Sequence, residues 1–174
     1  MTISEPFRLG PEAGSLSIFT FKEGLLSKVA HDLELRATVY SIEGAGGELR
    51  VSVDPRGIRV LHAIVHGRPS PSVLSNGQRE EIEETMRRKI LEVRRFPEIV
   101  FTAKLADWDG ERLSGRLNLH GIERVQGVDI KRNDRGFQIS TPLHQPDFRI
   151  KPYSALFGAL KVKPEIRIEG TFIL

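Results

Sequence analysis

The chain of 174 residues carries 26 Lys and Arg against 23 Asp and Glu, a formal net charge of +3, and 39% of its residues are hydrophobic. This is the composition of an ordinary globular domain, and it excludes collagen-like and low-complexity chains. The absence of cysteine excludes disulfide scaffolds, thiolate metal sites and cysteine nucleophiles. At about 150 residues per domain, one domain is expected, and it is long enough to bury a core.

Residues 1–14 are interpreted as an N-terminal segment and residues 15–174 as a single domain. Glu5, Arg8 and Glu12 interrupt the segment, which contains no apolar run of seven or more residues. We therefore expect no signal peptide and a cytoplasmic location. No stretch of the sequence approaches the roughly 18 apolar residues of a transmembrane helix, so no membrane span is expected.

A sequence pI of about 9.4 raises the question of nucleic-acid binding. The basic excess lies in residues 88–174, which hold 16 basic and 11 acidic residues, whereas residues 1–87 hold 10 and 12. Acidic residues interrupt the basic ones almost throughout. A solvated basic surface is therefore favoured over a nucleic-acid footprint.

Apolar residues alternate with polar ones along most of the chain, the period of strands with one buried face. Turn sequences such as 44–47, 54–57, 107–110 and 133–136 separate these stretches, and such short links join antiparallel neighbours. Eight or nine strands are predicted. In chain order they cover residues 15–21, 33–39, 49–53, 57–65, 99–105, 113–119, 125–131, 137–141 and 166–174.

One segment instead has helical periodicity. Between residues 76 and 93, Ile82, Met86, Ile90 and Val93 recur at intervals of three and four, with charged residues between them. Ser75 or Asn76 is the expected N-cap. Shorter helical turns are predicted within residues 24–33 and 153–160.

An all-β chain with one longer helix must bury the apolar face of its sheet. We predict an antiparallel, closed β-barrel of about eight strands, similar to a lipocalin, in which the helix packs across one end. The inward residues are nearly all aliphatic or aromatic, so a ligand inside the barrel would be apolar. A barrel filled by its own side chains is the alternative.

Histidines are the residues most able to carry chemistry here. His62 and His66 have a spacing that suits a metal on a helix, but on a straight strand they lie roughly 13 Å apart, so no metal site is expected. His31, His120 and His144 are interpreted as turn or network residues rather than catalytic bases. No catalytic residues and no cofactor are predicted. Trp108 falls in the 107–110 turn, where we expect it to be exposed or half-packed.

Three stretches together resemble the YceI-like family, lipocalin-like barrels associated with polyisoprenoid binding. Residues 91–101, LEVRRFPEIVF, are similar to the family pattern L…(F/Y)-P-x-I-x-F. Residues 115–124, GRLNLHGIER, are similar to G-x-L-x-L-H-G-x-x-(R/K). Residues 147–150, DFRI, are similar to D-F-G-I, with Arg149 in the place of the glycine.

The resemblance implies a non-enzymatic protein that binds, carries or sequesters an apolar lipid, in particular a polyisoprenoid, inside the barrel. It is compatible with a homodimer, although no motif specifies an interface. From the alternation we expect the following residues to line the interior: Phe19, Phe21, Ile99, Phe101, Leu105, Leu117, Leu119, Phe137 and Ile168. His62 and His66 would share the inner face with Ile58 and Val60, where either could contact a polar head group.

Two other interpretations of the function stay open at this stage. The first is an interaction module whose barrel is filled and holds no ligand. The second is an enzyme that depends on His31, His62 or His120. The sequence does not name the lipid, the pathway or a protein partner.

Overall fold

The computed structural model of the chain describes residues 6–25 and 30–173. Residues 1–5, part of the predicted N-terminal segment, and residues 26–29, part of the predicted turn at 24–33, lie outside the described residues. Phe7–Leu9 of that segment forms strand β1, which pairs with β5 (Tyr40–Ala45).

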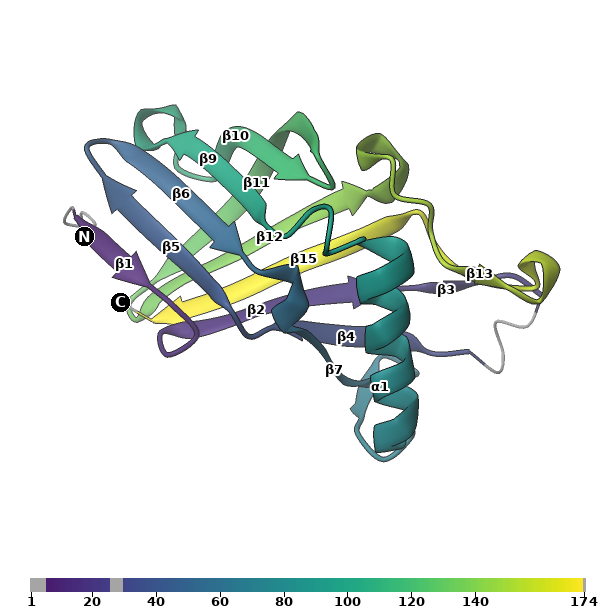
Figure 1. Ribbon diagram of the computed structural model, residues 1–174. Coiled ribbons are helices and arrows are strands. Elements are labelled where there is room, and N and C mark those ends of the chain that lie inside the picture. Colours follow the sequence, from purple (N-terminus) through teal and green to yellow (C-terminus); the bar gives the residue numbers. More distant parts are fainter. Residues whose placement is uncertain (1–5, 26–29, 174) are drawn as a thin grey trace.

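Most of the chain forms one antiparallel sheet of 12 strands, in the order β1-β5-β6-β9-β10-β11-β12-β15-β2-β4-β7-β8. The sheet curls strongly around a central space (Figure 1). The remaining strands are β2 (Gly14–Thr20), β4 (Asp32–Ala37), β6 (Glu48–Val53), β7 (Ile58–Val65), β8 (Arg68–Ser70), β9 (Ile99–Lys104), β10 (Arg112–Leu119), β11 (Ile122–Asn133), β12 (Gly136–His144) and β15 (Glu165–Ile173).

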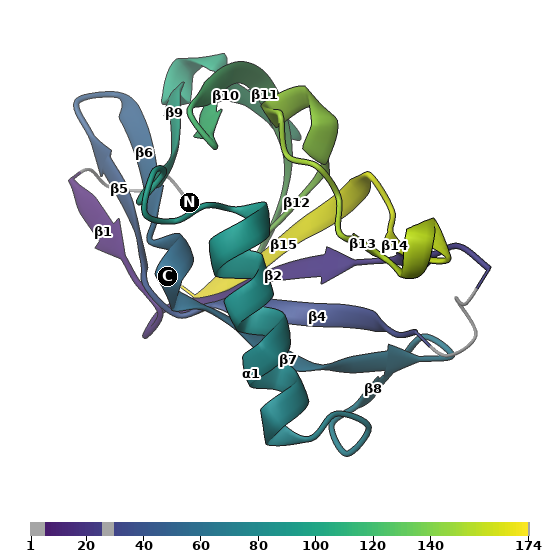
Figure 2. The same cartoon turned by 45° about the vertical axis from the view of Figure 1, so that its right-hand side comes forward.

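A second, three-stranded sheet consists of β13 (Ser154–Ala155), β14 (Leu160–Val162) and β3 (Lys22–Glu23). It projects from the curled sheet beyond the helix (Figure 2). Its loop contains a 3₁₀ turn, η5 (Leu156–Gly158), within the turn predicted for residues 153–160. Further 3₁₀ turns are η1 (Pro55–Gly57), η3 (Leu105–Asp107) and η4 (Gln145–Phe148).

The all-β class and the antiparallel pairing agree with the prediction, but the closed barrel of about eight strands is wrong. In the described residues the large sheet is a curled half-barrel that ends at β1 and β8. The strand count was too low because five strands are only two or three residues long, too short to display a period of two. The six-residue strand β5 was also missed. The last strand, β8, pairs with Ala63, Ile64 and Val65 of β7. Val60 N, outside that pairing, donates to Glu83 Oε1 of the helix (2.9 Å) instead of to a strand.

The predicted helix is present, but it ends before residue 93. Helix α1 (Asn76–Thr85) continues into a π-helical turn, η2 (Met86–Ile90). Ser75 is the N-cap in a capping box with Gln78, which satisfies two backbone N–H groups that a helix start leaves unpaired. Ile82 and Met86 pack against the core, as their spacing predicts. The helix crosses the open side of the curled sheet (Figure 2).

Phe172 is the centre of the main core. It is 1% exposed, and its ring lies 5.1 Å from that of Phe137 and 6.2 Å from that of Tyr40, between ring centroids. The Tyr40 hydroxyl donates to Gly14 O (3.0 Å), and burial raises the pKa of this hydroxyl. Each fully buried side chain of this size contributes about 1.5–3 kcal/mol through the hydrophobic effect.

Candidate ligand cavity

The curled sheet encloses a cavity of about 700 Å³, which falls in the range of about 300–1,000 Å³ that is typical of small-molecule sites. Strands from both halves of the chain line it, and η2 covers it with Met86 and Ile90. The lining is aliphatic or aromatic, with these polar exceptions among the described residues: Thr20, Gln126, Arg132, Thr141 and Gln145. The space therefore suits an apolar ligand.

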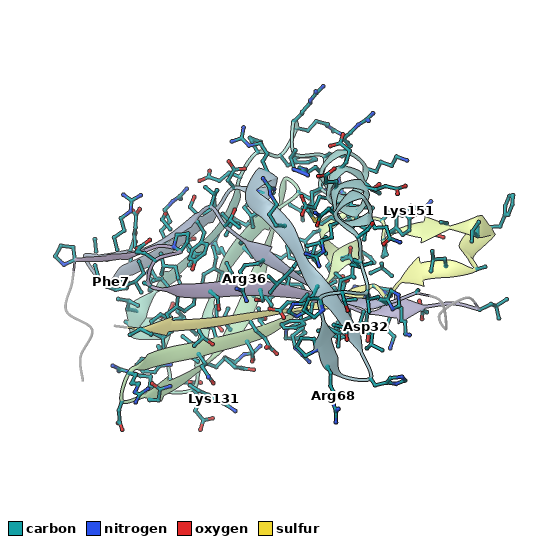
Figure 3. The ribbon with its side chains drawn as sticks, turned by 90° about the horizontal axis from the view of Figure 1, so that it is seen from below. Phe7, Asp32, Arg36, Arg68, Lys131 and Lys151 are labelled. Carbon is teal, nitrogen blue, oxygen red and sulfur yellow. The ribbon has the colours of Figure 1, made fainter. Side chains whose placement is uncertain are left out.

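Alternation along the strands builds this lining. On β10, Leu113, Leu117 and Leu119 line the cavity, whereas the intervening side chains lie on the other face. Charged residues occupy the outer face of the sheet, where Figure 3 shows Arg36 on β4 and Lys131 on β11. The sequence folds this way because burying the aliphatic face removes it from water and leaves the charges solvated.

The structure places seven of the nine predicted lining residues along the cavity. They are Ile99, Phe101, Leu105, Leu117, Leu119, Phe137 and Ile168. They come from β9, η3, β10, β12 and β15, so residues distant in the sequence meet around one space. Their role in ligand binding stays a prediction.

Phe19 and Phe21 were predicted to face inward, and the structure places them outside the cavity. On β2 the residues that line the cavity are Leu16, Ile18 and Thr20, so Phe19 points the opposite way. The guanidinium of Arg167 lies over both rings, 5.1 Å from the Phe19 centroid and 5.7 Å from that of Phe21. Apolar residues on both faces of this strand made its inward face ambiguous in the sequence.

His62 and His66 also lie outside the cavity lining, although Ile58 on the same strand is part of it. A bulge between β4 and β7 pairs Leu35 with Val60 but Glu34 with His62, so one extra residue shifts His62 to the outer face. His62 Nε2 there lies 2.9 Å from Glu34 Oε2. His66 is exposed in the turn between β7 and β8, with φ of 50°.

Three polar side chains of the lining donate hydrogen bonds within the protein. Gln126 Nε2 donates to Thr141 Oγ1 (2.6 Å), and Thr141 Oγ1 donates to Gly127 O (2.8 Å). Gln145 Nε2 donates to Lys163 O (3.0 Å). These three donors therefore need no polar partner from a ligand.

Trp108 also lines the cavity, which its position in the 107–110 turn did not predict. Its indole Nε1 is buried and, unlike the three donors above, has no acceptor among the described residues. The Arg132 guanidinium lies over its ring, 5.5 Å from the centroid. A buried donor left unpaired is costly, so this nitrogen is an unsatisfied polar group in the wall of the cavity.

His120 links two segments of the cavity wall. Its Nε2 lies 2.9 Å from Glu92 Oε2, its Nδ1 lies 3.2 Å from Phe148 O, and its ring packs on Phe96. The adjoining residues Leu91 and Leu119 both line the cavity. These contacts make His120 a structural link between the two segments.

Within residues 6–25 and 30–173, no cluster of three or more His, Asp or Glu side chains is arranged to hold a metal ion. The helices in the same residues are too short or too polar to cross a bilayer.

A curled antiparallel sheet around an apolar cavity, crossed by one helix, is an all-β architecture with room for a small molecule. The sequence matches the model of the YceI-like domain over residues 12–173. The chain therefore belongs to the YceI-like family. The comparison with curated proteins gave no match.

Two solved structures share the fold. One is a polyisoprenoid-binding domain from Saccharophagus degradans implicated in plant cell wall breakdown, with 14% identity, 90% of each chain covered and a TM-score of 0.57. The other is BcnA from Burkholderia cenocepacia, with 11% identity, 90% of this chain and 93% of that chain covered, and a TM-score of 0.57.

Proposed function

We propose that this protein is a non-enzymatic carrier or sequestering protein for an apolar lipid, in particular a polyisoprenoid, which it holds in the cavity of about 700 Å³. That cavity is the observation that carries the proposal. Membership of the YceI-like family and the likeness to a polyisoprenoid-binding domain support the choice of ligand class.

The physical case rests on the composition of the lining. A polyisoprenoid tail is a hydrocarbon without polar groups, and each Å² of apolar surface it buries contributes about 25 cal/mol. The aliphatic walls of β9, β10 and β15 supply that surface. Because the Nε2 donors of Gln126 and Gln145 already have acceptors in the protein, a tail that passes them leaves no donor newly unpaired.

The filled-core alternative is disfavoured by the size of the cavity.

Mass spectrometry of an organic extract of the natively purified protein tests the proposal. We expect a long prenyl lipid in stoichiometric amount, and delipidated protein should take up an added long-chain polyprenol. Extracts free of lipid, together with no uptake of polyprenol, quinone or fatty acid probes, would contradict the proposal. Uptake of the fatty acid alone would show that the protein carries a lipid but that the lipid is not a polyisoprenoid.

A further inference from the structure

Residues 151–163, which we call the arm, leave the curled sheet and carry exposed apolar side chains at their tip. Phe157 is 113% exposed relative to its reference state, Leu156 is 61% exposed and Tyr153 is 37% exposed. Figure 1 shows the arm, through β13, on the far side of α1 from the rest of the sheet. Adjacent large apolar residues in full contact with water indicate an interaction surface.

The backbone at the tip is also unusual. Leu156 has φ of 50° and Phe157 has φ of 54°, so two consecutive residues with large side chains adopt the left-handed conformation. This conformation is disfavoured for residues with a Cβ atom. In the arm it accompanies solvent exposure and buries neither side chain, which points to a role for the tip outside the folded domain.

The arm is basic as well as apolar. It holds Lys151, Lys161 and Lys163 and no acidic residue. All three lysines are exposed, and none of them forms an ion pair with a described residue. The acidic neighbours Glu23, opposite Lys161 on β3, and Glu165 lie outside the arm. Figure 3 shows Lys151 at the start of the arm.

The arm is attached directly to the cavity wall. Ile150 and Ile166, which lie just outside its two ends, both line the cavity. Gln145 fixes the returning end, since its N donates to Pro164 O (2.9 Å) and its Nε2 donates to Lys163 O (3.0 Å). Lys163 N donates to Phe21 O (2.8 Å). The tip therefore projects from an anchored base.

We propose that the arm docks this protein onto the surface of an anionic phospholipid bilayer. Leu156 and Phe157 insert among the acyl chains, while the lysines contact lipid phosphates. Charge complementarity favours this partner, because lysines along the arm behind its apolar tip match a surface of phosphates over hydrocarbon. A projecting tip of two side chains offers a protein partner little flat area, but it can enter a bilayer. Docking does not require a ligand in the cavity, so it is independent of the proposed function.

Co-sedimentation of the intact protein with vesicles tests the proposal. Equimolar phosphatidylcholine and phosphatidylglycerol vesicles are compared with vesicles of phosphatidylcholine alone. We expect binding to the anionic vesicles, weakened by added salt, and weaker binding to the neutral ones. Phe157→Ser should weaken binding at least about tenfold. Lys151→Gln and Lys163→Gln should each weaken it about fivefold.

Ile173→Ser is the matched control. Ile173 is 65% exposed, similar to Leu156, and lies beside the C-terminus at the opposite end of the sheet from the arm (Figure 1). This variant should bind vesicles like the unchanged protein. A Phe157→Trp substitution on a Trp108→Phe background should be quenched by brominated phospholipids, which reports insertion at the tip. This readout does not depend on the stability of a binding-deficient variant.

Several results would overturn the proposal. They are no binding of the unchanged protein to anionic vesicles, equal binding by the Phe157→Ser variant, or an unquenched tryptophan at position 157. Capture of another protein through the arm without vesicle binding would assign the surface to a protein partner and also overturn it. Lipid extraction from the cavity is a separate measurement, so failure of one proposal does not imply failure of the other.

Discussion

Glu92 and His120 are 28 residues apart in the sequence, yet His120 Nε2 lies 2.9 Å from Glu92 Oε2. The other ring nitrogen lies 3.2 Å from Phe148 O. Both neighbours are hydrogen-bond acceptors, so both bonds form together when the imidazole carries two protons. The ring thereby joins the segment after η2, the end of β10 and the η4 turn into one part of the cavity wall.

The Glu92 carboxylate predicts an acid-sensitive stability. Hydrogen bonds from Arg95, and next from His120, lower the pKa of Glu92 below its usual range. The stabilisation is therefore present above the ordinary glutamate pKa of about 4.3 and is lost as the pH falls through the lower native value. Urea unfolding across this range should show a flatter pH dependence for Glu92→Gln than for the unchanged protein.

Glu84→Gln is the control for that experiment, since Glu84 is exposed and pairs only with Arg88 on the same helix. It should leave the acid dependence of the urea midpoint unchanged. An equal flattening in both variants would show that the Glu92 contact contributes nothing specific.

Glu83 is predicted to hold α1 on the edge of β7. The residue is 8% exposed, its Oε1 accepts from Val60 N (2.9 Å), and its Oε2 pairs with Arg87 (3.1 Å). Glu83→Ala leaves the Val60 N–H without its acceptor, so we expect a loss of about 1–3 kcal/mol in the free energy of unfolding, measured by urea denaturation. Glu83→Gln keeps an acceptor oxygen and should lose less.

Trp108 is the single tryptophan of the chain and lines the cavity, so its fluorescence should report ligand binding. Adding a long-chain polyprenol to delipidated protein should shift and saturate the emission, because apolar ligand atoms replace any solvent near the indole. Trp108→Phe should abolish the signal while lipid still co-purifies. Unchanged emission in protein that holds extracted lipid would place the ligand elsewhere.

Filling the cavity should block the ligand without unfolding the protein. Leu117→Trp combined with Ile168→Trp adds volume inside the space of about 700 Å³. In a packed core such enlargement costs about 1–3 kcal/mol, but an empty cavity can accept it. We expect a near-native urea midpoint and loss of polyprenol uptake.

Val125→Trp is the matched control for the filled cavity, because Val125 is 79% exposed on the outer face. It should retain full uptake. Retained uptake by the Leu117→Trp, Ile168→Trp variant would show that the ligand does not occupy this cavity.

The period-two alternation of apolar and polar residues was enough to predict the class of fold and much of the cavity lining, and apolar residues three and four apart predicted the helix. Strands such as β10 have one aliphatic face and one charged face, so burial admits a single orientation. The N-cap was also predictable, because Ser75 caps the helix through hydrogen bonds with Gln78, three residues further along the chain.

Other features depend on contacts with residues distant in the sequence, which a local sequence pattern does not reveal. The bulge opposite Glu34 and Leu35 reverses the orientation of His62, and β2 is apolar on both faces, so Phe19 could not be oriented from its sequence. The sequence by itself determined which faces of the strands and of the helix must be buried, because hydrophobicity is a property of each residue. Only the tertiary structure decided that the sheet stays open at β8, that Trp108 reaches the cavity and that Glu92 meets His120, because each depends on contacts between distant segments.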